Sequence, residues 1–533
     1  MAQTGSASLS EKDKKFREFA LTGNLWNVIF YVCVPLAFFQ FINHLFNILD
    51  TMMASHVSAI AVSAVAYLSQ LQNMISAVGG GLAAGSTLKI SEAYGAGDYE
   101  MVKKRLSTLL TICGTIALVV LCLIPFSTVL LRASGTPEDF IAVGARYFSV
   151  TLFSTVLSFF NNVYIAIERS RGNSRRILKL NLLVVILKLA LTAVFIYGLN
   201  GGITMIAVAT VISQAFLFIM AVRNLCMGDN AFTFSKSSIV FKRPVVFPML
   251  NLSFPVIVEK VAFSMGKTVV NSMSKNYGST TVGALGISNN INGMVTGIHN
   301  GFQDGGSSII SQNLGAGNTK RALGTYWRLV VINAAIGAVG LVLLNVFLGP
   351  ITWLFANSTE GFNEEFQQLI MHVFRYEAIG GCIPLGINAA CMALLFGFGR
   401  TKLTLVCNFS RVFLFRIPIL WALQNFTSLG SESVGIVMAA SNILTAMLSF
   451  IIAMLVIRGV KKQERQGVEA VSTEKNEEAI KDEEAIKDEE AIKDEDAIKD
   501  EEAAKGEEAI KDEDAAKDEE VVKDEDAAKD VTP

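Results

Sequence analysis

The chain has 533 residues, of which 52% are hydrophobic and only 17% are charged, and its mean hydropathy is +0.46. A soluble protein of this length would not be so apolar, so the composition indicates a polytopic membrane protein. The formal net charge of −2 hides two opposite parts. Eight of the nine acidic hexapeptides over 477–530 carry −2 and one carries −1, which leaves the remaining chain at about +15.

Apolar runs of membrane-spanning length recur along the chain. They are continuous rather than alternating, so they predict helices and not barrel strands. We expect an all-α protein with twelve transmembrane helices, over 26–48, 59–83, 107–131, 142–166, 178–198, 203–222, 251–273, 282–304, 327–349, 369–396, 402–424 and 433–457. The predicted parts are an N-terminal segment (1–24), an N-lobe of helices 1–6 (25–224), a linker (225–248), a C-lobe of helices 7–12 (249–460) and an acidic tail (461–533).

A repeat divides these helices into two equal sets. Pro35–Asp98 aligns with Pro255–Asn318 at a constant offset of 220 residues, and both copies end in a Gly-Ala-Gly turn. Six helices per copy give both copies the same orientation, so the symmetry axis should follow the membrane normal. Transporters place substrate sites at the seam between such repeats. The alternative is a duplication retained as architecture, as in a channel or scaffold.

Basic residues concentrate on one side of the predicted membrane. They occur in seven segments, 12–17, 103–105, 169–176, 223–243, 320–321, 400–402 and 461–462. Such a bias predicts a multi-pass protein of the cell membrane with both termini in the cytoplasm. The first apolar run is preceded by a polar, charged segment and has no cleavage site, so helix 1 should be an uncleaved anchor.

Polar residues inside apolar runs are costly and point to function. Helix 1 carries Gln40, Asn43, Asn47 and Asp50 at spacings that place them on one face. Asp50 is suited to hold Na⁺, H⁺ or a cationic substrate, or else is a carboxylate capped by the next turn. Lys188 lies near the middle of helix 5 without an acid in its own helix, so it should snorkel, pair across the bundle or face water.

The second half is richer in such residues. Helix 7 carries an acid, Glu259, which is either an ion site or one partner of a buried ion pair. The other candidates for a substrate cavity are polar or basic, and the amides among them are equally suited to join helices. They are Lys260, Lys267, Asn271, Asn289, Asn300, Gln303, Asp304 and Arg375, with Arg411 and Arg416 as further intramembrane basic residues.

Other chemistries lack their signatures. The seven cysteines are scattered, and no metal-ligand spacing, nucleophile–base set or phosphate loop is present. We therefore expect neither an enzyme nor a nucleic-acid-binding protein, and no cofactor besides a coupling ion. The hexapeptide tail is either a low-complexity appendage or an autoregulatory arm, and its six-residue period gives no continuous apolar face.

Four segments carry a resemblance to a known family. They are Pro35 with the Asp-Thr pair at 50–51, GLAAGSTLKISEAYGAGD at 81–98, FPVIVEKVAFSMGKTVVN at 254–271, and the stretch 286–318. Over residues 25–460 the chain resembles the multidrug and toxic compound extrusion (MATE) transporters, whose superfamily includes polysaccharide and lipid-linked oligosaccharide flippases.

The resemblance implies an antiporter with two six-helix lobes in a V, and we expect it to be a monomer. It would lie in the lipid bilayer and export bulky, often cationic, drug-like organic compounds in exchange for Na⁺ or H⁺ by alternating access. Asp50 matches the acid of helix 1 in the family and Glu259 resembles that of helix 7, whereas Lys188 stands where many bacterial members have Asp. The alternative within this fold is a flippase for a lipid-linked, phosphate-bearing precursor, clamped by Lys188, Arg375, Arg411 and Arg416.

Overall fold

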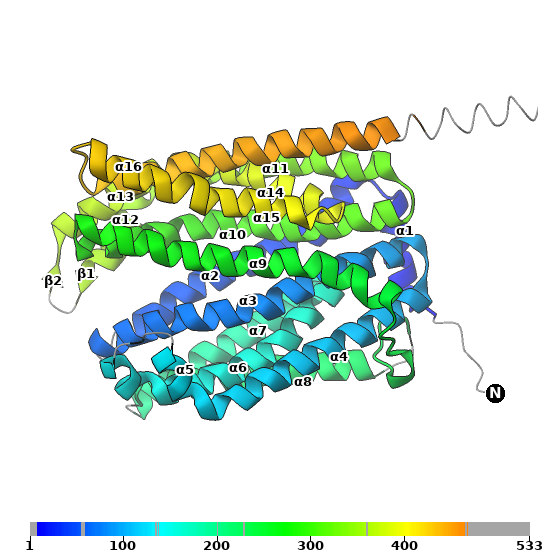
Figure 1. Ribbon diagram of the computed structural model, residues 1–533, viewed down its shortest axis with the longest axis horizontal. Coiled ribbons are helices and arrows are strands. Elements are labelled where there is room, and N and C mark those ends of the chain that lie inside the picture. Colours follow the sequence, from blue (N-terminus) through cyan, green and yellow to red (C-terminus); the bar gives the residue numbers. More distant parts are fainter. Residues whose placement is uncertain are drawn as a thin grey trace, which may run out of the picture. The chain divides into compact units, whose positions relative to one another are not determined.

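Helices make up nearly all of the described chain (Figure 1). The computed structural model describes residues 8–54, 59–133, 136, 138–199, 201–227, 230–358, 361–463 and 466, so the acidic repeats lie outside the described residues. The chain divides into a unit that ends at Met454 and a unit that begins at Leu455. The first unit contains nearly all of the described helices.

The two halves of this unit contain similar series of helices. The first half comprises α1 (Glu11–Thr22), α2 (Leu25–Ala54), α3 (Ala59–Ala96), α4 (Tyr99–Leu123), α5 (Ser127–Ala133), α6 (Glu138–Ser170), α7 (Ser174–Ala193) and α8 (Ile203–Cys226). The second comprises α9 (Arg243–Ser274), α10 (Ser279–Gly315), α11 (Thr319–Val346), α12 (Leu348–Ala356), α13 (Glu364–Gly381), α14 (Ile383–Gly397), α15 (Thr401–Phe409) and α16 (Ile417–Phe426).

Shorter elements connect or interrupt these helices. Three are 3₁₀ turns, η1 (Ile124–Phe126), η3 (Lys236–Ser238) and η4 (Lys275–Tyr277), and two are π-helical, η2 (Val194–Gly198) and η5 (Ser410–Arg416). The strands β1 (Asn357–Ser358) and β2 (Gly361–Phe362) form a two-residue antiparallel pair. A last helix, Glu432–Gln463, follows α16.

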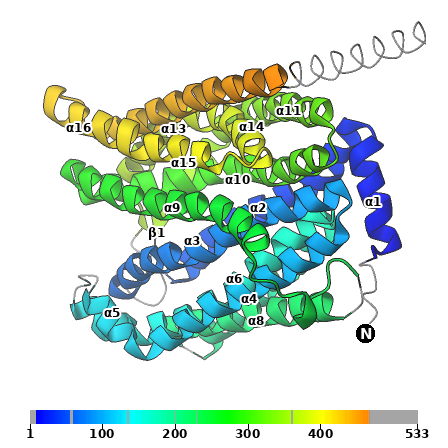
Figure 2. The same ribbon diagram turned by 45° about the vertical axis from the view of Figure 1, so that its right-hand side comes forward.

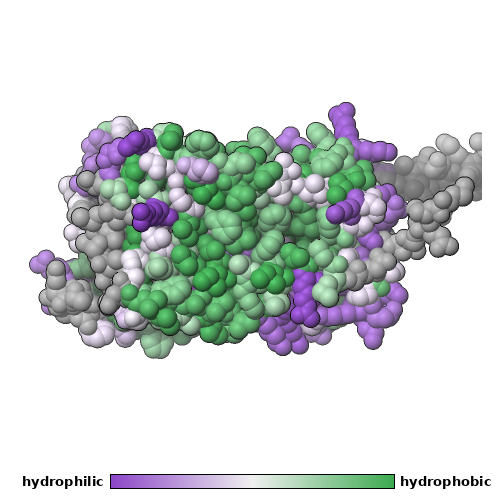
Figure 3. All heavy atoms as spheres, turned by 90° about the horizontal axis from the view of Figure 1, so that it is seen from below, coloured by the Kyte–Doolittle hydropathy of each residue, from purple (hydrophilic) through white to green (hydrophobic). Residues whose placement is uncertain are grey.

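The all-α prediction is confirmed, and ten of the twelve predicted spans coincide with helices long and apolar enough to cross a membrane, counted over the described residues. The other two, 59–83 and 282–304, fall in α3 and α10, unbroken helices of 38 and 37 residues that are richer in polar side chains. Figure 3 shows apolar side chains over the middle of one face and hydrophilic ones toward its ends.

The sequence repeat is a structural symmetry. The helices α3 and α4 begin at residues 59 and 99, and α10 and α11 begin 220 residues later, at 279 and 319. Each copy contacts the other across the seam: α3 of the first half packs on α9 of the second half, and α10 of the second half packs on α2 of the first (Figure 2). The repeat predicted from the sequence therefore places equivalent helices on opposite sides of one seam.

Glycines bring the backbones together at this seam, in pairs that obey the same offset. A Cβ on Gly85 would overlap the backbone of Ser253, and one on Gly305 would overlap Cys33, the residue equivalent to Ser253. Four further pairs of positions follow the same rule: 81 with 257 and 301 with 37, and at the turns 95 with 312 and 315 with 92. Small residues allow this approach, which maximises van der Waals contact between helices in a membrane.

The first helix, α1, contacts residues of both halves at one end of the bundle (Figure 2). Arg17 donates to the carbonyls of Tyr94 and Gly95 in the first half, while Arg321 of the second half donates to the carbonyls of Ala20 and Gly23 in α1 and its cap.

The turn after α6 completes this anchoring of α1. The guanidinium of Arg171 donates two hydrogen bonds to the buried carboxylate of Asp13, at 3.0 and 3.1 Å, and one to Glu168. Burial disfavours the charge of Arg171, but the bond to Asp13 and the two carboxylates outweigh it and raise the pKa of the guanidinium. Together these hydrogen bonds hold α1 against the end of α3, the turn after α6 and the start of α11.

We predict that Gly85→Ala and Gly305→Ala each destabilise the protein, because the added Cβ would overlap the backbone of Ser253 in the first variant and the Sγ atom of Cys33 in the second. The expected loss of unfolding free energy is about 1–3 kcal/mol, measured as a lower Tm of the detergent-purified protein. Gly80→Ala is the control, since a Cβ there meets no atom within 4 Å. Equal Tm values for all three variants would contradict the role of the glycines.

Candidate functional site

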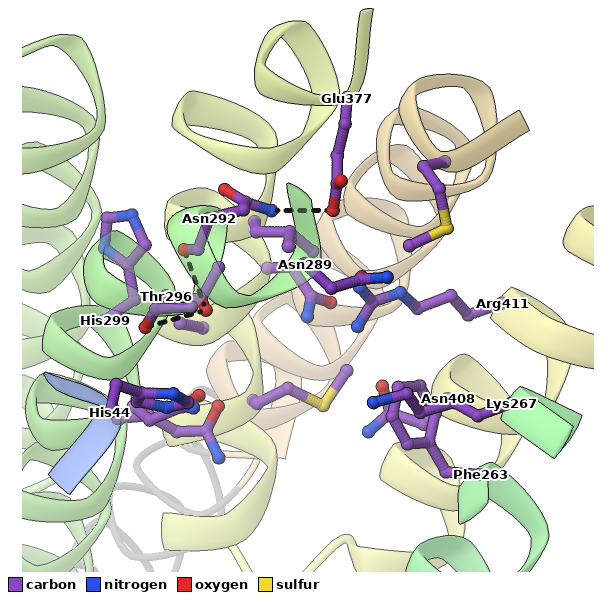
Figure 4. Close-up of a pocket in the computed structure, with 18 of the residues that line it drawn as sticks. His44, Phe263, Lys267, Asn289, Asn292, Thr296, His299, Glu377, Asn408 and Arg411 are labelled. Atoms are coloured by element: carbon purple, nitrogen blue, oxygen red, sulfur yellow. Dashed lines mark hydrogen bonds between the residues drawn. The ribbon is translucent and has the colours of Figure 1, made fainter. Parts of the chain in front are cut away.

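A cavity of about 460 Å³ lies among the helices of the second half. Its walls are α9, α10, α13, α14, α15, η5 and the last helix, and His44 of α2 closes one side (Figure 4). Of the residues predicted to form a substrate cavity, it contains Glu259, Lys260, Lys267, Asn289, Asn300 and Gln303.

Glu259 is held in this cavity by neutral donors. Glu259 is only 9% exposed. Its two carboxylate oxygens accept hydrogen bonds of 2.7 Å from Thr404 Oγ1 and Asn408 Nδ2. Thr404 and Asn408 are four residues apart and therefore project from the same face of α15. The buried ion pair considered for Glu259 is not formed within 4.0 Å, as far as the described residues show.

Glu377 of α13 repeats this arrangement on another wall. It is 1% exposed and accepts hydrogen bonds from Ser288 Oγ at 2.5 Å and Asn292 Nδ2 at 3.2 Å. Ser288 and Asn292 are again four residues apart, here on α10. The cavity thus contains two buried carboxylates, each bonded to two neutral side chains rather than to a cation.

Four basic side chains also line the cavity: Lys260 and Lys267 from α9, and Arg411 and Arg416 from η5. Figure 4 shows Lys267 and Arg411 extending from one wall into the open space. With two carboxylates against four basic groups, the charged residues of the lining have a formal excess of two positive charges.

Two histidines lie on the wall opposite Lys267 and Arg411 (Figure 4). His299 is fixed by Asn333 Oδ1 at 2.9 Å and the carbonyl of Cys382 at 3.1 Å, which orients the ring within the bundle. His44 reaches in from α2 over Gly293 and Gly297, and a Cβ on either glycine would approach its ring to 2.9 and 2.7 Å. These two glycines therefore make room for the imidazole of His44.

A second cavity, of about 250 Å³, lies in the first half. Of the predicted residues it contains Asn43 and Lys188, next to a hydrogen bond of 2.7 Å from Asn161 Nδ2 to Gln214 Oε1. The side chains of Asn47 and Asp50 lie outside the described part of the chain. Pairing of Lys188 across the bundle, one of the predicted alternatives for this residue, therefore stays a prediction.

The remaining predicted residues lie elsewhere. Arg375 is exposed on α13, and the prediction that it lines the cavity is wrong. Residues two apart on a helix point ~200° apart, so Glu377 faces inward while Arg375 faces away. Asp304 does not line the cavity either, and its side chain forms an ion pair of 2.6 Å with Arg169 of α6. Gln40 and Asn271 are half-buried in α2 and α9 but line neither cavity.

The predicted phosphate clamp of four basic residues is not assembled. Lys188 lines the cavity of the first half, Arg375 is exposed, and only Arg411 and Arg416 lie together. The predicted set also missed Glu377, Arg416, Arg411, Asn408 and both histidines as cavity residues. The charged members were detectable as rare ionisable residues in apolar runs, whereas Asn408 gives no such signal.

The repeated helices, the apolar spans and the polar cavity define a duplicated helical membrane protein of the transporter class. The sequence profile of the MatE family matches residues 35–194 and 255–422, the two copies of the repeat. The chain belongs to this family, the MATE transporters, and the resemblance found in the sequence is confirmed.

Several relatives have names that refer to drug resistance or detoxification. The probable multidrug resistance protein YoeA of Bacillus subtilis is 25% identical over 66% of this chain and 76% of its own. The probable multidrug resistance protein NorM of Thermotoga maritima is 21% identical over 76% and 87%, respectively. Protein DETOXIFICATION 32 of Arabidopsis thaliana is 26% identical over 82% and 84%.

Solved structures show the same fold. A MATE protein in complex with MaL6 has a TM-score of 0.80 at 19% identity and covers 85% of this chain and 100% of its own. A MOP superfamily transporter from Pyrococcus furiosus, described as having a binding pocket of reverse polarity, has a TM-score of 0.79 at 19% identity over 85% and 99%. Members of this family are transporters rather than enzymes.

We predict that Glu377→Leu destabilises the protein more than a change of an exposed acid. The substitution leaves Ser288 and Asn292 without their buried acceptor, and each such group costs about 1–3 kcal/mol. The Tm of the purified protein should fall for Glu377→Leu and stay unchanged for Glu364→Gln, whose side chain is exposed at the start of the same helix. An unaltered Tm for Glu377→Leu would show that these hydrogen bonds contribute nothing to stability.

Proposed function

We propose that this chain is a secondary active exporter that moves small organic compounds out of the cell by alternating access, in exchange for Na⁺ or H⁺. The observation that carries the proposal is the polar cavity of the second half, in which buried carboxylates lie beside a space large enough for an organic molecule. Membership of a transporter family supports the same reading.

Glu259 is the proposed coupling group in this cavity. Its neutral partners, Thr404 and Asn408, stabilise the ionised form without committing it to a fixed counter-charge. Such a carboxylate can exchange a proton, and together with the oxygens of its partners it offers the hard ligands that Na⁺ prefers. Asp50 of α2 is proposed as a second coupling group in the first half, by its match to the acid of helix 1 in the family.

We further propose twelve membrane spans in two lobes, 25–224 and 249–460, joined by the linker 225–248 and working as a monomer in the cell membrane. The segments 1–24 and 461–533 would both be cytoplasmic. Contacts of α1 support one part of this arrangement, because basic segments from both halves meet at its end of the bundle. The linker reaches the same end, where the N–H of Ala231 donates to the carbonyl of Ser8.

We predict that Glu259→Gln abolishes gradient-driven export yet preserves folding, since the amide fits the same space but neither exchanges a proton nor neutralises a cation. Proteoliposomes with separately imposed Na⁺ and pH gradients would report the export of cationic ethidium and of anionic carboxyfluorescein. Asp50→Asn should impair the same coupling, and Glu364→Gln is the exposed control. Full gradient-driven export by Glu259→Gln would remove this residue from the mechanism.

The cytoplasmic placement of the basic segments predicts how two exposed serines respond to labelling. A membrane-impermeant maleimide applied to intact cells should miss Ser237→Cys, in the basic linker, and label Ser428→Cys, between α16 and the last helix. The background would lack Cys122 and Cys226, which are exposed among the native cysteines. The reverse labelling pattern would invert the proposed orientation.

A further inference from the structure

Three basic side chains crowd one part of the cavity in the second half. Arg416 is 2% exposed, Arg411 is half-buried, and Lys267 reaches into the same space from α9. The charges of both arginines repel that of Lys267, and the two arginines repel each other. Confining like charges away from bulk water is costly unless an opposite charge lies between them.

No carboxylate of the described chain provides that charge by direct contact. Glu377 acts on both arginines at longer range, yet none of its oxygens lies within 4.0 Å of their nitrogens, and its own hydrogen bonds come from Ser288 and Asn292. Glu259 is likewise bonded to neutral donors. The basic cluster therefore keeps its positive charge facing the cavity.

The protein holds the two arginines in place through neutral groups. Arg411 Nε and Arg416 Nη2 donate to the same atom, Asn442 Oδ1, at 3.0 and 3.1 Å, and Arg416 Nε donates to Ser441 Oγ at 3.1 Å. The Arg411 guanidinium also lies 5.4 Å from the ring centroid of Phe263. Within the described residues, the hydrogen bonds of Arg411 use Nε alone, which leaves its two terminal nitrogens for another acceptor.

A local distortion of the helix brings these arginines to one face. In a regular α-helix, residues five apart point ~140° apart, so Arg411 and Arg416 would face different neighbours. The π-helical turn η5 (Ser410–Arg416) bonds each residue to the fifth along the chain, which aligns the pair. Pro418 lies two residues after the end of this turn and cannot donate a backbone hydrogen bond, which favours such a widened turn.

We propose that Lys267, Arg411 and Arg416 form a binding site for an anionic group, such as a phosphate, sulfonate or carboxylate, on the transported compound. The proposal rests on the exporter function given above and specifies the substrate class of that cavity. It departs from the cationic compounds that the family resemblance implies. The forked terminal nitrogens of arginine suit oxyanions, and charge-assisted hydrogen bonds of this kind are among the stronger ones in proteins.

The rest of the cavity suits an organic body attached to this group. Apolar side chains of Phe263, Leu385, Met392 and Met438 share the lining with the polar residues. Methionine adapts its shape readily and appears at surfaces that bind varied ligands. The site is thus built for an amphiphilic anion, whose source is either a soluble organic acid or the head group of an acidic lipid.

Calorimetric titration of the full-length protein in a neutral detergent tests the inference with two probes of the same ring system. The anionic 1-naphthyl phosphate should bind at least about tenfold more tightly than the cationic 1-naphthylmethylammonium. Arg411→Gln and Lys267→Gln should each weaken phosphate binding by about 10- to 100-fold, the range expected for hydrogen bonds to charged groups. Arg375→Gln, which alters an exposed arginine outside the cavity, should leave it unchanged.

Lys267→Gln keeps the test valid if Arg411→Gln fails to fold, because Lys267 makes no hydrogen bond to any described residue. Titration in nanodiscs of phosphatidylcholine with and without phosphatidylglycerol separates the two sources: competition by the acidic lipid supports a lipid head group, and its absence supports a soluble anion. Equal or tighter binding of the cationic probe, or unchanged phosphate affinity in both variants, would overturn the inference.

This titration needs no ion gradient, so its result is independent of coupling. Ion-coupled export of ethidium by a protein that does not bind 1-naphthyl phosphate would refute the anion site and leave the exporter function standing. Binding of 1-naphthyl phosphate without any gradient-driven export would support the anion site and refute the exporter function.

Discussion

The close approach of backbones along the seam between the two repeats is the constraint on which the rest of the structure depends. Gly85 against Ser253 and Gly305 against Cys33 are equivalent contacts, so each half supplies the small residue that the other requires. Because α3 packs on α9 and α10 packs on α2, neither half can complete its packing alone. The cavities lie to either side of this seam, within the helices that it positions.

The scaffold is symmetric, but the chemistry is not. At the offset of 220 residues, Glu259 corresponds to Phe39 and Lys260 to Gln40. At these two positions the first half has an apolar ring and an amide where the second half has charges, although the helices that carry them are equivalent. The duplicated helices are equivalent in place, whereas the larger cavity in the second half contains the two buried carboxylates and the basic cluster.

The repeat is visible in the sequence, and six residues named there as polar within apolar runs line the larger cavity, because such side chains require polar surroundings. Arg375 was placed in the cavity wrongly, since a helical period shows which residues share a face but not which face is turned inward. Asp304 was misassigned because its partner Arg169 lies in a distant helix. The pairing of Arg411 with Arg416 was hidden for another reason: a period of 3.6 residues gives no sign of a π-helical turn.

The position of α1 has a consequence for how the protein assembles. During synthesis α1 leaves the ribosome before the helices that follow it, yet Asn313 and Arg321, which donate to the carbonyl of Ala20 in α1, follow 293 and 301 residues later. Contacts so far apart in sequence form only after the intervening chain has been made and inserted. The helix α1 therefore completes its contacts only after the chain has been made as far as α11, although its contacts with Tyr94 and Gly95 are available much earlier.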